Sequence, residues 1–196
     1  MAILTWPEAL RPSNMEWKLT SNSKEFTSPF TGASQVVSWP GSRWSMSLKF
    51  ENLDDWESRK LEVLIAKLDG MAGMIKVGDF GRWGRPPFGK PVVKGSNNTG
   101  TELPTRGWDA NRLVLKEGDY ITVNDELKLV TEDVWSDAQG LATIKISPLL
   151  REMPPDGATI ETQNPYGIFR LSSNENSVTR APAFNNTINL EFKETF

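Results

Sequence analysis

Hydrophobic residues in this chain follow two different periods within a short stretch. From residue 43 to 50, apolar side chains alternate with polar ones, which predicts a strand with one buried face. From residue 61, apolar side chains recur at intervals of three and four residues, which is typical of one face of an amphipathic helix. Asp54 and Glu57 predict a capping box at the start of this helix, and Gly70 predicts its end. The apolar helical positions are Leu61, Leu64, Ile65 and Leu68.

Turn residues frame the segments before and after this strand and helix. Residues 28–32, Ser-Pro-Phe-Thr-Gly, predict a turn before a short extended segment at 35–37. Pro40 and Gly41 supply the fixed φ and the positive φ of a tight turn between that segment and the strand that follows. After the helix, residues 74–77 predict a short return strand.

The second half of the chain has the pattern of short strands separated by turns. Residues 81–107 are rich in Gly, Pro, Asn and Thr, and we predict a loop at 95–101. Four short strands at close spacing then predict a small barrel or sandwich. These four predicted strands cover residues 113–115, 120–123, 127–130 and 142–146, and further alternation follows at 160–162, 168–171 and 187–192.

With one predicted helix, the chain cannot be a helical bundle or a parallel α/β sheet, which needs several crossover helices. Alternation at 15–19 adds an early strand to the first part of the chain. We therefore predict a mainly β (α+β) protein of two units. One is a β-rich domain built from residues 1–88 and 164–196 with the helix at 54–68, and the other is a small β-barrel inserted at 89–163.

The chain has no His and no Cys, which excludes Ser-His-Asp and Cys-His nucleophilic sites, the common zinc sites and disulfides. Its acidic residues are scattered and form no distinguishable catalytic pair. We therefore expect no enzymatic activity, no catalytic residues, no metal and no cofactor. No run reaches the length of a membrane helix, and the N-terminal residues lack the features of a signal peptide, so we expect folding in a cytoplasm without membrane insertion.

Charge is distributed unevenly along the sequence. Residues 109–163 carry 11 acidic and 5 basic residues, whereas residues 1–108 carry 11 and 14. The net charge of the middle segment disfavours nucleic-acid binding, because that binding depends on Lys and Arg contacts to phosphate. The segment is either a solvated acidic surface or a wall that faces passing DNA without binding it.

Tryptophan is frequent, with eight residues, and its positions suggest different roles. Trp39, Trp44 and Trp56 lie in or beside predicted strands and the helix, so we predict that they are buried. Trp83 lies in a Gly- and Pro-rich loop with two arginines and Phe88, which is either a plug over its own barrel or a contact arm. Trp108 and Trp135 in the middle unit are either packing residues or sugar-stacking platforms; packing is the favoured interpretation. 

The order of these short motifs resembles that of the distal tail protein, a tail-tip protein of long-tailed bacteriophages. The resemblance covers much of the chain, although each motif is short, and one loop departs from it: Asp79 is followed by Phe80 and Gly81, where relatives often have Asp-Pro. The matching motifs are Ser-Pro-Phe-Thr-Gly at 28–32, Gln35, Pro-Gly at 40–41, Arg-Trp at 43–44, the helix and return strand, and the segments 115–121, 154–157 and 167–171.

The resemblance implies a tail-tube-like β-sandwich or split barrel with one packed helix, plus an inserted barrel of the oligonucleotide/oligosaccharide-binding type. It implies a structural protein of the virion tail tip, assembled in the host cytoplasm as a hexameric ring. That ring would join the tail tube protein to the baseplate hub and leave a channel for DNA. We expect its interface to use strand edges and the loop residues Arg82, Trp83, Arg85 and Phe88. The alternative is a carbohydrate- or receptor-binding module of a phage tail.

Overall fold

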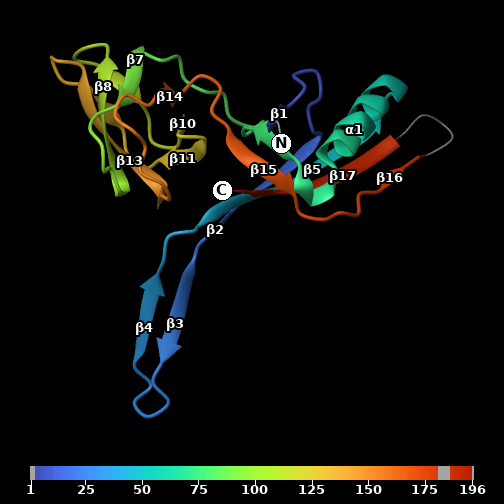
Figure 1. Cartoon of the computed structure of the whole chain (residues 1–196), viewed down its shortest axis with the longest axis horizontal. Coiled ribbons are helices and arrows are strands. Elements are labelled where there is room, and N and C mark those ends of the chain that lie inside the picture. The colour runs from blue at the N-terminus through green and yellow to red at the C-terminus, as the bar shows by residue number, and fades with distance from the viewer. Residues whose placement is uncertain (1–2, 181–185, 196) are drawn as a thin grey trace.

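The computed structural model describes residues 3–180 and 186–195. The chain is mainly β, with one α-helix in this part and one nearly closed, barrel-like sheet. Figure 1 shows a barrel at one end of the long axis, a sheet with the helix at the other, and a two-stranded arm that projects away from both. The expected β-rich chain with a single packed helix is confirmed.

The larger sheet has seven strands and combines both ends of the described chain. Its longest strand, β5, buries Trp44, Met46, Leu48 and Phe50 on one face and turns Ser and Lys side chains to the other, which confirms the predicted alternation. In spatial order the strands are β1 (Ile3–Thr5), β6 (Met74–Val77), β15 (Gly167–Leu171), β17 (Asn186–Glu194), β5 (Arg43–Leu53) and β2 (Asn14–Thr20), with β16 (Val178–Thr179) paired to β17.

The helix α1 (Asp55–Leu68) covers the buried face of this sheet. Its predicted capping box is present, because the Asp54 side chain accepts from the Glu57 backbone and the Glu57 side chain accepts from the Asp54 backbone. Leu61, Leu64 and Leu68 are buried in the same cluster as the apolar face of β5. The helix ends at Leu68, as expected, with a left-handed Asp69 (φ of 50°) as its C-cap and Gly70 directly after it, and a short 3-10 turn, η1 (Gly70–Ala72), follows.

Pro40 and Gly41 do not form the tight turn that the sequence predicted. Strand β3 (Ser23–Thr27) continues from β2 and pairs with β4 (Ser34–Ser38), which leads into β5, so the chain keeps its direction through Gly41. The two residues instead make a bend in a long hairpin. Asn22 fixes this bend, since its carbonyl accepts from Trp39 N at 2.8 Å and its Nδ2 donates to Pro40 O at 2.8 Å.

The second sheet curves into the nearly closed barrel. Its two ends meet where Val93 N donates to Ala158 O at 2.9 Å and Gly157 N donates to Val93 O at 3.0 Å. A second cluster of buried aliphatic residues fills the interior. In spatial order the strands are β14 (Ile160–Glu161), β10 (Tyr120–Val123), β11 (Glu126–Val130), β13 (Leu141–Leu150), β8 (Gly100–Trp108) and β7 (Gly89–Val93), and a small pair, β9 (Leu113–Leu115) with β12 (Val134–Trp135), lies beside them.

One strand of this barrel begins inside the loop that the sequence predicted. The loop predicted at 95–101 ends at residue 99, because β8 starts at Gly100, and β7 and β8 occupy much of the Gly- and Pro-rich stretch 81–107. Pro104 has no N–H to donate, yet its carbonyl accepts from Lys94 N at 2.9 Å. Strand β8 therefore tolerates proline at this position.

The tryptophans divide differently from the prediction. Trp44 is buried, but Trp39 is 41% exposed on the arm and Trp56 is 51% exposed on the outer face of α1, so two of the three predicted core positions were wrong. In the barrel, Trp108 is buried and donates to Thr105 Oγ1 at 2.7 Å, whereas Trp135 is exposed.

Replacing Leu64 tests whether α1 is held by its buried face. Leu64→Ala should lower the free energy of unfolding by about 2–5 kcal/mol, because a cavity forms under a buried leucine. Val63→Ala, on the exposed side of the same helix, should change it by less than about 1 kcal/mol. Equal losses in urea unfolding of the two variants would contradict the packing of α1 described above.

Candidate functional site

The arm, residues 23–39, is a two-stranded ribbon that stands apart from both sheets. Its strands β3 and β4 pair only with each other among the described residues, and Val37 alone of their ten residues is partly buried. Figure 1 shows the arm extending away from both sheets, so its sides face solvent. A two-stranded ribbon is only marginally stable in water, and beyond its base, where it continues the hairpin of β2 and β5, this ribbon packs against no other described strand.

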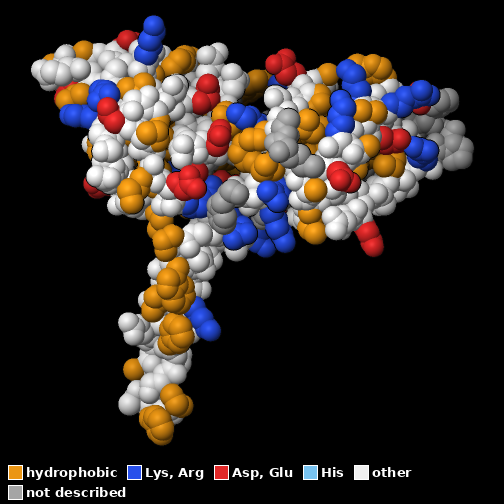
Figure 2. Space-filling view, in the orientation of Figure 1, with side chains coloured by type: hydrophobic (Ala, Val, Ile, Leu, Met, Phe, Trp, Pro, Cys, Tyr) orange, Lys and Arg blue, Asp and Glu red, His pale blue; other side chains and the backbone are white. Residues whose placement is uncertain are grey.

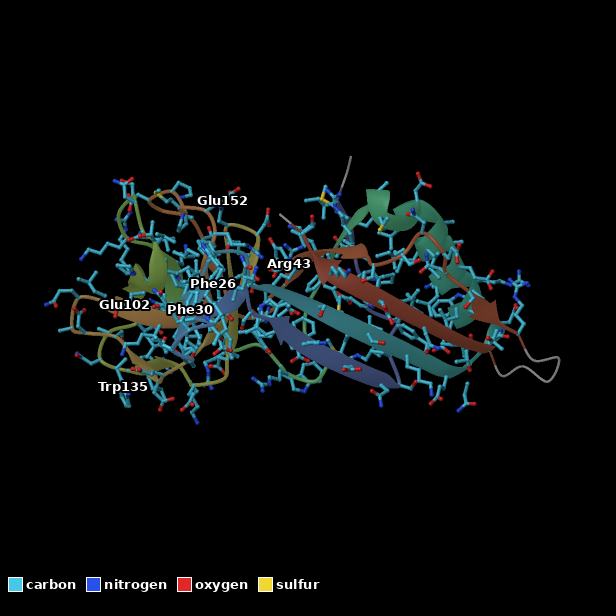
Figure 3. All side chains as sticks on the ribbon, turned by 90° about the horizontal axis from the view of Figure 1, so that it is seen from below. Phe26, Phe30, Arg43, Glu102, Trp135 and Glu152 are labelled. Carbon is cyan, nitrogen blue, oxygen red and sulfur yellow. The ribbon has the colours of Figure 1, made fainter. Side chains whose placement is uncertain are left out.

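One face of the arm carries its exposed aromatic side chains. Phe26 lies opposite Gln35, and alternation places Lys24, Val37 and Trp39 on the same side, whereas the other side carries Ser and Thr with Glu25 and Val36. The Phe26 and Trp39 rings meet edge to face, with centroids 6.4 Å apart. Figure 2 shows hydrophobic side chains along the length of the arm, and Figure 3 labels Phe26 and Phe30 on it. Exposed aromatic side chains grouped in this way are typical of a surface that binds another protein.

The four residues expected at an interface lie on the loop between β6 and β7, but they do not share one environment. Arg82 donates to Gly118 O at 2.6 Å, and Arg85 forms an ion pair with Asp119. Phe88 is partly buried against the barrel core, with the Arg112 guanidinium 3.7 Å from its ring. These three contact their own barrel. Trp83 is 82% exposed and covers no core, so the loop is not a plug formed by its tryptophan.

Close backbone packing fixes the position of this loop. Arg85 N donates to Thr162 O at 2.8 Å, and Thr162 Oγ1 donates to Arg85 O at 2.8 Å. A Cβ at Gly84 would overlap the carbonyl oxygens of Thr162 and Gln163, so the absence of a side chain allows this approach. The loop therefore holds Trp83 at a defined place on the surface.

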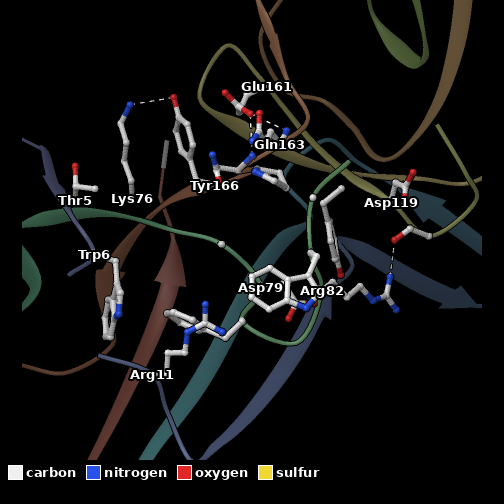
Figure 4. A pocket seen from close by; sticks show the side chains of 18 residues that line it. Thr5, Trp6, Arg11, Lys76, Asp79, Arg82, Asp119, Glu161, Gln163 and Tyr166 are labelled. Atoms are coloured by element: carbon white, nitrogen blue, oxygen red, sulfur yellow. Dashed lines mark hydrogen bonds between the residues drawn. The ribbon is translucent and has the colours of Figure 1, made fainter. Parts of the chain in front are cut away.

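A pocket of about 680 Å³ lies beside Trp83, between the seven-stranded sheet and the barrel. Its walls come from β1, β6, the 79–84 loop, the segment before β10 and the segment before β15, as Figure 4 shows. Arg11 lies with its guanidinium carbon 4.9 Å from the Trp83 ring centroid. The aromatic lining residues are Trp6, Phe80, Trp83, Tyr120 and Tyr166.

A hydrogen-bonded chain forms one wall of the pocket. Lys76 Nζ donates to Tyr166 OH at 2.9 Å, and Tyr166 OH donates to Asp125 Oδ1 at 2.8 Å. The hydrogen bond to Tyr166 raises the pKa of Lys76, and burial raises the pKa of Tyr166. Both shifts keep Lys76 as a charged ammonium and Tyr166 as a neutral phenol at neutral pH. In these forms the two side chains act as hydrogen-bond donors that hold the wall together, not as nucleophiles.

A buried ionic cluster joins the barrel to the seven-stranded sheet. Arg151, just after β13, donates to Glu194 Oε1 on β17 at 2.7 Å, and Trp44 N donates to the other oxygen at 3.0 Å. Arg151 also pairs with Glu126, which pairs in turn with Lys128. Lys128 has no exposed side-chain surface, and this burial lowers its pKa. The cluster fixes the orientation of the two pocket walls.

Within residues 3–180 and 186–195, no group of three or more acidic residues is placed to hold a metal ion, and no helix is long and apolar enough to span a membrane. No protein-family model matches the sequence, and no curated protein sequence matches it. The arm, the sheet edges and the pocket are the surfaces of the described residues that could bind a partner.

Sequence reasoning placed Trp83 on the surface loop as one of two alternatives but missed the arm. Two segments of equal length, residues 23–27 and 34–38, flank the turn at 28–32 symmetrically, although neither shows hydrophobic alternation. Reading Pro40 and Gly41 as a reversal concealed that symmetry. The pocket had no signal in the sequence, because five separate segments form it.

Removing the carboxylate of Glu194 should disrupt the junction. Glu194→Ala leaves the Arg151 guanidinium without this buried acceptor, so the free energy of unfolding should fall by about 3–5 kcal/mol in urea denaturation. Glu191→Ala, on the exposed face of the same strand, should change it by about 0.5 kcal/mol or less. Similar values for the two variants would show that this pair does not hold the junction.

Adding one methyl group at Gly84 should displace the loop that carries Trp83. Gly84→Ala should destabilise the protein by about 1–3 kcal/mol, since the new Cβ meets backbone oxygens that have no room to move. Gly81→Ala is the matched control, because its Cβ would meet only the Asp79 side chain, at 3.2 Å. Thermal unfolding of both variants checks this, and an unaffected Gly84→Ala would contradict the close packing.

Proposed function

We propose that this chain is a ring-forming structural protein of a bacteriophage tail tip, of the distal tail protein type. In this role it assembles as a hexameric ring between the tail tube and the baseplate hub and leaves a channel for DNA. The motif order at 28–78 suggests the family. The observation that carries the proposal is the arm, an apolar two-stranded ribbon that finds no partner on its own chain.

The edges of the seven-stranded sheet support assembly in a ring. Strands β1 and β2 lie at opposite ends of its order, and each pairs on one side only. Unpaired strand edges are sites where another chain can add. Two different edges on one subunit favour a head-to-tail contact, which closes into a ring when its rotation divides a full turn. The sheet with one helix on its inner face is also compatible with a tail-tube-like fold.

The outer face of this sheet suits the wall of a channel. Across β2, β5 and β17, the row Lys18–Ser45–Lys193 is followed by the row Glu16–Ser47–Glu191, as the strand registers place them. Figure 3, seen from below, shows these three strands side by side. Alternating rows of opposite charge bring little net attraction for phosphate, so DNA would pass such a wall without binding it. In this arrangement the acidic 109–163 segment lies on the outside of the ring.

A second candidate is a carbohydrate- or receptor-binding module. The exposed Trp135 on the barrel favours it, because a flat aromatic ring at the surface can stack on a sugar. A purified chain that binds host-surface polysaccharide through Trp135, and that stays monomeric, would favour this alternative over the ring.

Mass in solution tests the proposed function directly. We expect light scattering and negative-stain images of the purified chain to show a ring of six copies. Replacing the apolar arm residues in Phe26→Ser with Trp39→Ser should shift the protein toward monomer without lowering its melting temperature, since both side chains are substantially exposed. Trp135→Ser, which removes an exposed tryptophan elsewhere, should leave the ring intact. A wild-type chain that remains monomeric even within assembled tails would overturn the proposal.

A further inference from the structure

The tip of the arm presents a single aromatic side chain to solvent. Phe30 is 95% exposed, more than any other large hydrophobic residue described. The turn that carries it is well defined, because Gly32 N donates to Ser28 O at 3.0 Å and Ser28 N donates to Ala33 O at 2.8 Å. Exposing a phenyl ring on an ordered turn is unfavourable in water, so the ring is placed for a contact outside its own subunit.

The carbonyl oxygens beside this ring are also unused. Among the described residues, those of Pro29, Phe30 and Thr31 accept no hydrogen bond within the chain. The tip therefore offers an aromatic ring together with three acceptors. A complementary site would need aromatic walls and hydrogen-bond donors around its mouth.

The pocket beside Trp83 has both properties. Its aromatic walls suit a phenyl ring, and its volume of about 680 Å³ leaves room for the flanking turn. Arg11 stacks on Trp83 and has no carboxylate partner among the described residues, so its guanidinium N–H groups are available as donors. The side-chain amides of Gln163 and Asn164 line the same pocket and donate to no described residue. Aromatic residues and arginine are the types most often found at the energetic centre of interfaces.

The tip cannot fill the pocket of its own subunit. Thr5, at the end of β1, lines the pocket, and Figure 1 places β1 in the body of the molecule, whereas the tip lies at the far end of the projecting arm. A second copy of the same chain supplies a tip for each pocket. The contact is then heterologous, because each copy uses its tip on one neighbour and its pocket on the other.

We propose that Phe30 of one copy inserts into the pocket beside Trp83 of the next copy, with Arg11 of that copy donating to a carbonyl of the 28–32 turn. This inference rests on the proposed self-assembly and names the two surfaces that carry it. It assigns Trp83 a partner and explains why the loop holds that residue in place while the other three predicted residues contact their own barrel.

Thiol cross-linking tests the contact, and the natural chain contains no cysteine to interfere. The variant with both Thr31→Cys, next to Phe30, and Thr5→Cys, on the pocket wall, keeps Phe30 and Trp83. Treated with a short bismaleimide, it should give a ladder of covalent multimers under denaturing conditions. Each single variant should remain mostly monomeric, because the contact joins unlike residues. The control with Thr31→Cys and Trp135→Cys should also remain mostly monomeric. No ladder in the Thr5 variant, or an equal ladder in the control, would overturn the inference.

Assembly measurements provide a second readout. Phe30→Ser and Trp83→Ser should each raise the protein concentration needed for ring formation by about 30-fold or more, the usual effect of losing a central aromatic residue. Both side chains are almost fully exposed in the subunit, so the melting temperature of the monomer should not change. Mixing the two variants should give dimers and no rings, because only one intact tip and one intact pocket can meet.

The possible outcomes separate the two proposals. Rings that survive Phe30→Ser unchanged, with no cross-link between positions 31 and 5, would refute the tip-in-pocket contact and leave the proposed ring standing. A wild-type chain that forms no ring, alone or in tails, would refute both. Rings in which position 31 cross-links to a different tail protein would assign the tip to that protein and also overturn this inference.

Discussion

The carboxylate of Glu194 lies fully buried where the barrel meets the seven-stranded sheet, and it accepts hydrogen bonds from Arg151 of one unit and from Trp44 of the other. Burying charge is costly, and only paired and hydrogen-bonded groups offset that cost. This cluster meets the condition through a continuous chain of opposite charges that ends at Lys128. Removing any one of these side chains would leave a buried charge without a partner. The cluster therefore stabilises one relative orientation of the two sheets.

The candidate site depends on that orientation. The aromatic pocket takes its walls from β1 and β6 of the sheet and from the segment before β10 of the barrel, so a small rotation between the units would open or close it. Secondary contacts reinforce the same arrangement: Trp44 Nε1 donates to Leu127 O at 3.1 Å, and Thr122 Oγ1 and Tyr166 exchange two hydrogen bonds. The loop with Trp83 is then fixed from both sides by Arg82 and Arg85. Trp83 therefore keeps a defined position on the surface, because the contacts of Arg82 and Arg85 hold the loop that carries it.

An element could be predicted from the sequence where nearby residues determine its structure. It could not be predicted where residues far apart in the sequence determine it. The helix was predictable, since the Asp54 and Glu57 cap and the buried leucines are local features. The barrel strands near residues 113–146 were predictable from their spacing, whereas β7 and β8 were not predicted as strands, because their Gly- and Pro-rich sequences carry no clear alternation; β8 is held by pairing with both β13 and β7. Trp39 and Trp56 were predicted to be buried because they are hydrophobic and lie beside a strand and in the helix. Hydrophobicity does not show whether the chain has other residues that cover them. The pocket requires five segments to meet, which no local pattern encodes.

The exposed aromatic side chains of the arm could cause uncontrolled aggregation of the free subunit. The arm mixes its aromatic residues with Lys24 and with a second face of Ser and Thr, and such polar residues limit uncontrolled pairing of edge strands. A ribbon with an apolar face still has a free-energy cost in water, and that cost is recovered only when the face is covered. A heterologous contact leaves one tip and one pocket unused in every open assembly, so growth continues until the last tip reaches the first pocket. In the proposed ring, closure would place every tip in a pocket, so no subunit would keep its tip exposed.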